Sequence, residues 1–153
     1  MKKINYFIIV AAVLMLIIPL LGCPTKFDGK EWDPMPVGDV IGDLDGDGMA
    51  LPALAPVGGD FLSSVEFTYA NTMSDWSGGN GTMNFKVRKV AGDWGGGDYG
   101  LADGVDAPVV GGDFVELGGG GGNITVTGLQ NGTKYRITVK STASAVSLKI
   151  EAI

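Results

Sequence analysis

The chain has 153 residues, with 11 basic and 17 acidic side chains, no histidine and a single cysteine. This composition excludes Ser-His-Asp and Cys-His catalysis and the usual zinc sites. A carboxylate pair for glycoside hydrolysis is disfavoured, because most of the acidic residues lie in glycine-rich turns. A catalytic acid needs rigid and partly desolvated surroundings that raise its pKa. The acidic balance also disfavours nucleic acid, which needs clustered Lys and Arg. We therefore expect neither an enzyme nor a nucleic-acid-binding protein.

The N-terminus, residues 1–22, has the pattern of an export signal, with two lysines before an apolar run at 7–21. That run is short for a membrane-spanning helix, which needs about 20 apolar residues. It ends in Leu-Leu-Gly-Cys at 20–23, which resembles the L-x-G-C lipobox of bacterial lipoproteins. The resemblance implies cleavage after residue 22 and lipidation of Cys23. The alternative is an uncleaved anchor with an incidental cysteine.

Lipidation at Cys23 implies a protein anchored in the bacterial envelope, with the outer membrane as the expected site. Several acyl chains on one residue anchor a protein stably, whereas one chain is marginal. Without residues 1–22 the net charge becomes −8, because that segment carries two lysines and no acid. A protein with this negative charge has no electrostatic attraction to anionic lipid headgroups. We therefore expect the lipid on Cys23, and not the protein surface, to bind the membrane.

Residues 23–57 are rich in Pro, Asp and Gly and show no sustained apolar period. This composition predicts a tether, with one short strand near Val37 to Ile41.

Within that segment, Asp43, Asp45 and Asp47 alternate and are followed by Gly48. The pattern resembles the start of a calcium loop, where alternating carboxylates converge on a hard cation. The twelfth position, however, is Leu54 instead of a bidentate glutamate. A weak Ca²⁺ site and a polar tether segment both stay open.

Residues 58–153 alternate apolar and polar side chains in short runs, as half-buried strands do. The runs are separated by glycine-rich turns, and Asn131-Gly132 has the signature of a type I′ hairpin. We expect an all-β, antiparallel, immunoglobulin-like β-sandwich. Its strands are expected at 64–69, 82–89, 114–117, 123–126, 134–140 and 145–150.

Aromatic residues beside polar ones are the remaining candidates for function. Sugar rings pack their C–H faces on Trp or Tyr rings, while polar neighbours bond the hydroxyls. The candidate glycan-binding residues are Trp76, Trp94, Tyr99, Asp98, Lys86 and Arg88. For Trp94 a plug at the end of the sandwich is an equally open interpretation.

The runs FKVRKVAGDWGGGDYG, LGGGGGNITV and NGTKYRITVKSTASAVSLKI resemble the SusE/SusF-type outer-membrane lipoprotein domains and the related pullulanase-associated starch-binding modules. The match covers roughly residues 85–153. It implies an immunoglobulin-like sandwich that binds α-glucans without cleaving them. Non-catalytic glycan binding is thus the leading hypothesis. A structural or adhesive lipoprotein with a protein partner is the first alternative, and a calcium-dependent module is the second.

Overall fold

The computed structural model describes residues 26–27, 30–31 and 33–153, which fall into two units divided between Asp33 and Pro34. In the first unit, β1 (Lys26–Phe27) pairs antiparallel with β2 (Lys30–Glu31). The expected signal sequence and Cys23 lie outside the described residues. The described part of the chain contains no helix that is long and apolar enough to span a bilayer.

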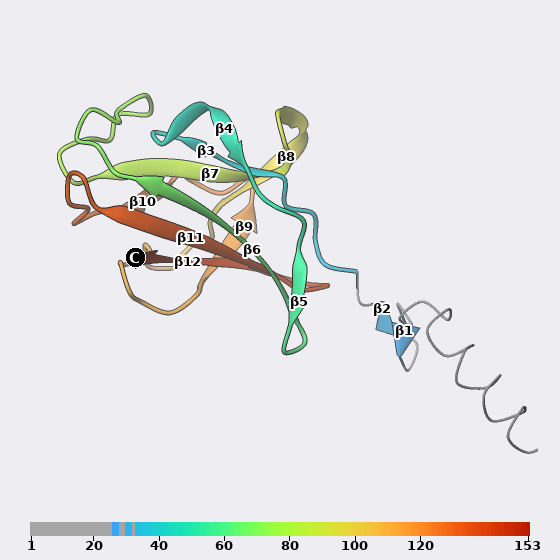
Figure 1. Cartoon of the computed structure of the whole chain (residues 1–153). Helices are drawn as coiled ribbons and strands as arrows, with labels where there is room; N and C mark the ends of the chain where they lie inside the picture. Colours follow the sequence, from blue (N-terminus) through green and yellow to red (C-terminus); the bar gives the residue numbers. More distant parts are fainter. Residues whose placement is uncertain (1–25, 28–29, 32) are drawn as a thin grey trace, which may run out of the picture. The chain divides into compact units, whose positions relative to one another are not determined.

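The second unit is all-β, and every ladder between its strands is antiparallel, as the alternating pattern predicts. Its ten-stranded sheet has the order β4-β3-β7-β8-β9-β12-β11-β6-β5, with β10 paired to β7 (Figure 1). The strands are β3 (Asp39–Gly42), β4 (Asp45–Ala50), β5 (Ala55–Val57), β6 (Asp60–Thr68), β7 (Met83–Val90), β8 (Asp93–Leu101), β9 (Val115–Gly119), β10 (Ile124–Val126), β11 (Lys134–Ser141) and β12 (Val146–Ala152).

The sheet curls into a sandwich-like fold with two facing layers. One layer holds β3, β4, β7, β8 and β10, and the other holds β5, β6, β11 and β12 (Figure 1). The apolar residues of each alternating run meet between the layers, since successive side chains of a strand point to opposite faces. All fourteen that the alternation predicts are buried: Val65, Phe67, Tyr69, Met83, Phe85, Val87, Ile124, Val126, Tyr135, Ile137, Val139, Val146, Leu148 and Ile150.

The expected tether is wrong over residues 34–57, which belong to the folded unit. The short strand expected near Val37 to Ile41 is present as β3, which pairs with both β4 and β7. Val40 is fully buried in the core. The Asp-Gly alternation after it forms a hairpin into β4, although its residues carry little apolar mass. Hydrogen bonding to β3 therefore holds a segment whose composition is typical of a linker.

The expected hairpin at Asn131-Gly132 is also wrong. The strand before it, β10, pairs with β7, whereas the strand after it, β11, pairs with β6 and β12. The turn therefore carries the chain from one layer to the other. Only Gly132 has a positive φ, at 79°, so the turn is not type I′. The Asn131 side chain instead accepts a hydrogen bond from the backbone N–H of Asn71 at 3.0 Å.

Candidate functional site

Trp76 and Trp94 lie together on the outer face of the layer that contains β3, β7 and β8. Their ring centroids are 6.0 Å apart and their planes differ by 23°. This is offset stacking, within the 4.5–7 Å range typical of aromatic pairs. Trp94 is 46% exposed, and Trp76 is half-buried. We call these two rings the indole pair.

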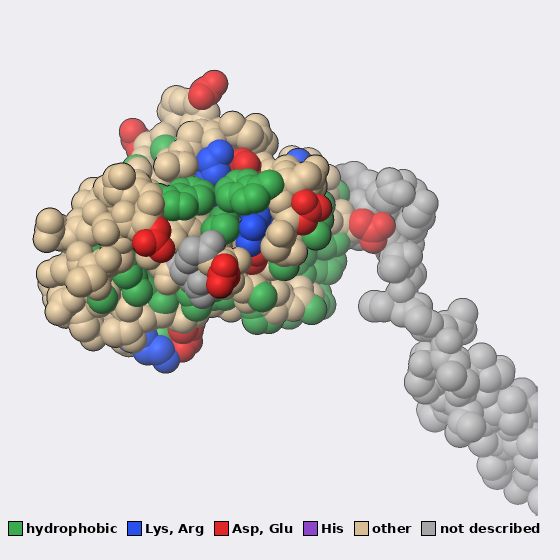
Figure 2. Space-filling view, turned by 90° about the horizontal axis from the view of Figure 1, so that it is seen from above, with side chains coloured by type: hydrophobic (Ala, Val, Ile, Leu, Met, Phe, Trp, Pro, Cys, Tyr) green, Lys and Arg blue, Asp and Glu red, His purple; other side chains and the backbone are tan. Residues whose placement is uncertain are grey.

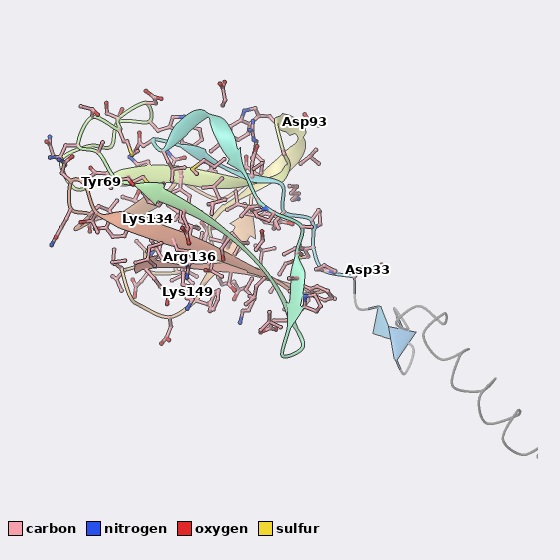
Figure 3. All side chains as sticks on the ribbon, in the orientation of Figure 1. Asp33, Tyr69, Asp93, Lys134, Arg136 and Lys149 are labelled. Carbon is pink, nitrogen blue, oxygen red and sulfur yellow. The ribbon has the colours of Figure 1, made fainter. Side chains whose placement is uncertain are left out.

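Two separate segments supply the indole pair. Trp76 lies in the loop between β6 and β7, and Trp94 is the second residue of β8. Figure 2 looks onto this layer and shows a band of hydrophobic side chains bordered by basic and acidic ones. Figure 3 marks Asp93, which begins β8 beside Trp94, at the end of the β7–β8 hairpin. The exposure of Trp94 rules against the plug interpretation for this residue.

The Arg88 side chain packs against the ring of Trp94. Its guanidinium carbon lies 5.3 Å from the ring centroid, within the range of a cation–π contact. Arg88 is only 3% exposed, whereas the ring is 46% exposed. A buried cation therefore contacts the ring of a residue that is nearly half exposed to solvent.

The charge of Arg88 is neutralised by Asp39, its neighbour in the β3–β7 register. The Arg88 Nε donates to the Asp39 carboxylate at 2.7 Å, and Nη2 donates to the other carboxylate oxygen. This hydrogen bonding raises the pKa of Arg88 above its ordinary value, although burial alone would lower it. Asp39 also accepts from the backbone N–H of Gly92 at 2.9 Å. A buried charge paired in this way keeps a fixed position.

Asp43 holds the backbone of Trp76, the second residue of the indole pair. Its carboxylate accepts the backbone N–H of Trp76 at 2.5 Å and that of Asn84 at 2.6 Å. The Asn84 side chain donates to the carbonyl of Trp76 at 3.2 Å. Both backbone groups of Trp76 are therefore held by neighbouring elements. Ser77 follows with a φ of 68°, a conformation that a non-glycine residue adopts rarely.

Lys86 and Asp98, two of the candidate glycan contacts, form an ion pair with each other at 3.2 Å. Their side chains are 16% and 17% exposed. They lie on adjacent strands, β7 and β8. Each retains polar atoms near the surface, but neither is an unpaired charge. This pairing suits hydrogen bonding to a neutral ligand better than recognition of a charged one.

Tyr99 does not join the indole pair at the surface, which corrects its place among the candidate contacts. It is 2% exposed and belongs to the hydrophobic core, paired with Val87 across the β7–β8 ladder. The stretch GGGDYG is thus part of a strand and not a turn, so the residue follows the strand alternation inward. Lys89 Nζ lies 5.1 Å from its ring centroid. Burial raises the pKa of the Tyr99 hydroxyl.

The aspartates of the expected calcium loop have separate surroundings. Asp43 is 3% exposed and uses its two carboxylate oxygens on backbone N–H groups. The backbone carbonyl of Asp47 accepts from Arg88 at 3.0 Å. The side chain of Asp45 lies outside what the structure describes. Among the described residues there is no group of three or more His, Cys, Asp or Glu able to hold a metal ion.

Sequence reasoning named Trp76, Trp94 and Arg88, which the fold brings together. Arg88, however, is 3% exposed and contacts Trp94 and Asp39, so its place among the glycan contacts is corrected. Sequence reasoning missed Asp39 and Asn84, because both sit in unremarkable polar positions and act through partners distant in the sequence. The only available signal was the expected strand near Val37 to Ile41, which placed an aspartate inside a sheet. A charged residue in such a place usually has a buried partner.

Comparisons with protein-family models, with curated proteins and with solved structures found no match to this chain. The resemblance to starch-binding lipoprotein domains therefore stays a prediction. The geometry of the indole pair is the stronger argument for function.

Proposed function

We propose that this protein is a lipoprotein of the bacterial envelope whose sandwich binds polysaccharide without cleaving it. The observation that carries the proposal is the solvent-facing ring of Trp94, stacked with Trp76 and backed by Arg88. An exposed indole on a strand of a rigid sheet is suited to the C–H faces of sugar rings. Lys86, Asp98 and Asn84 lie on the same layer and supply polar atoms for hydroxyl groups.

The size of the platform favours an oligosaccharide over a single sugar. Each ring offers its own contact area, and the two centroids are 6.0 Å apart. A chain of linked sugars would contact both rings more fully than one sugar would. The 23° between the ring planes would suit a chain that turns slightly from one sugar to the next.

The anchor at Cys23 is the second part of the proposal and rests on the lipobox pattern alone. A lipid-anchored domain with an acidic surface would remain at the membrane through its acyl chains, leaving the sandwich available to ligand.

Affinity electrophoresis tests the binding function. The purified protein is run through native gels that contain a soluble α-glucan, a soluble β-glucan or no polysaccharide. We expect slower migration in at least one polysaccharide gel and competition by a short oligosaccharide but not by its monosaccharide. Unchanged migration across a broad polysaccharide panel would contradict the proposal and favour a protein partner for the exposed ring. Repeating the gels with a calcium chelator separates a calcium-dependent module from the proposed one.

A further inference from the structure

Two buried aspartates at β3 each hold one half of the indole pair. Asp39 begins β3 and Asp43 follows its last residue, and they are 2% and 3% exposed. Burial of a carboxylate is costly unless its oxygens are hydrogen-bonded, and both aspartates meet this condition. The two segments that carry the indoles are thus attached to one short strand.

Asp43 holds the Trp76 loop by its backbone. The carboxylate accepts hydrogen bonds from the N–H groups of both Trp76 and Asn84, so it joins the loop to the start of β7. The loop also packs closely on Asp43, because a Cβ added at Gly78 would overlap Asp43 Oδ2. Glycine at this position therefore permits the loop to lie against the carboxylate.

Asp39 holds the Trp94 hairpin at two points. It pairs with Arg88, whose guanidinium backs the indole, and it accepts the N–H of Gly92 two residues before Trp94. The ring and the backbone of this hairpin thus depend on the same carboxylate. Each indole is connected to β3 by hydrogen bonds or by the cation–π contact.

We infer that Asp39 and Asp43 are positioning residues that set the separation of Trp76 and Trp94 before any ligand arrives. The ligand-binding consequence rests on the proposed function, but the positioning itself does not. Holding two rings in place in the unliganded protein lowers the ordering cost of binding. Loss of either carboxylate should therefore weaken binding by roughly two- to tenfold.

Circular dichroism of the full chain tests the positioning without a ligand. Indole transition dipoles 6.0 Å apart couple and give a bisignate far-ultraviolet band. The Trp76→Phe and Trp94→Phe variants define that band, because each removes one partner and leaves Trp32 unchanged. Asp43→Asn should lose most of the band, since an amide NH₂ accepts no hydrogen bond and one backbone donor loses its partner. The matched control is Asp106→Asn, an equal charge change at an exposed residue of the loop between β8 and β9.

A second variant keeps the inference testable if Asp43→Asn fails to fold. Gly78→Ala leaves the carboxylate and its charge in place, but the added Cβ would overlap Asp43 Oδ2 and the backbone carbonyl of Thr82, so the loop must shift. It should also lose the band while retaining a cooperative urea transition. A folded Asp43→Asn or Gly78→Ala protein with the full band would overturn the inference, as would a wild-type protein whose spectrum lacks it. Loss of the band in a folded variant supports the positioning role even if no polysaccharide binds the wild type. Absence of binding would contradict only the proposed function.

Discussion

The guanidinium of Arg88 is buried and lies 5.3 Å from the ring centroid of Trp94, a residue that is 46% exposed. The cation is itself paired with Asp39. A surface ring is therefore supported by a buried ion pair, so the ring position depends on two buried residues. The contact of Trp94 with Arg88 and the ion pair of Arg88 with Asp39 can each be tested by substitution.

Removal of the Trp94 ring should cost little stability. Trp94→Ala loses one aromatic contact and one cation–π contact, which together amount to about 1–2 kcal/mol. Phe85→Ala, at a fully buried position, should cost about 3–5 kcal/mol. Urea unfolding of both variants gives the comparison. A loss at Trp94→Ala as large as at Phe85→Ala would restore the plug interpretation.

The Asp39–Arg88 pair should behave as a coupled unit. Asp39→Ala leaves a buried guanidinium without its carboxylate, which should destabilise the protein by about 3–5 kcal/mol. Adding Arg88→Met removes the stranded charge and should recover part of that loss. A double-mutant cycle by urea unfolding measures the coupling. Additive losses would show that the two side chains act independently.

The Tyr99 hydroxyl is buried, and among the described residues it has no hydrogen-bond partner. Tyr99→Phe removes this unsatisfied group and should leave stability unchanged or raise it by up to about 1 kcal/mol. The matched control is Tyr135→Phe, because the Tyr135 hydroxyl accepts the N–H of Gln130 at 2.9 Å. That variant should destabilise the protein by about 1–3 kcal/mol. Equal losses at both positions would indicate that Tyr99 has an acceptor or donor of its own.

The same residue predicts sensitivity to alkali. Burial raises the pKa of Tyr99 in the folded protein, while the unfolded chain releases this proton near its ordinary pKa of about 10. Above that pH the unfolded state binds fewer protons, so stability falls as pH rises. Wild type should therefore lose stability faster than Tyr99→Phe between about pH 9 and pH 11. Parallel pH profiles of the two proteins in urea would contradict this.

The core of this fold is predictable from the sequence, and the support of the site is not. Val65, Phe67 and Ile137 follow a period of two, which is a local property of each strand. Asp39 is buried only because β3 lies beside β7 and places Arg88 opposite it. That pairing joins residues 49 positions apart and has no local signature. Composition alone therefore assigned the segment to a tether.

The positions of two aromatic residues were also predicted only in part from the sequence. Trp94 and Tyr99 lie five residues apart in one glycine-rich stretch, yet one ring is exposed and the other buried. An odd separation within one strand places two side chains on opposite faces of the sheet, so the alternation of β8 accounts for the difference. The glycine-rich composition of this stretch is typical of a turn, however, and does not reveal that the residues form a strand.

Lipidation is tested apart from the sandwich. Cys23→Ala removes the only thiol of the chain, so the precursor should stay uncleaved and carry no fatty acid. Metabolic labelling with a fatty acid, followed by membrane fractionation, measures both effects. Label retained by the variant would contradict the lipobox interpretation.

The most direct test of glycan binding compares single-ring variants in one titration. The polysaccharide that retards wild type in native gels is titrated calorimetrically into wild type, Trp76→Ala, Trp94→Ala and the exposed control Val109→Ala. The account predicts that both tryptophan variants lose at least about tenfold in affinity, or about 1.4 kcal/mol, while Val109→Ala binds as wild type does. Every variant must also keep a cooperative urea transition. Full affinity in a folded Trp94→Ala protein would contradict the central claim.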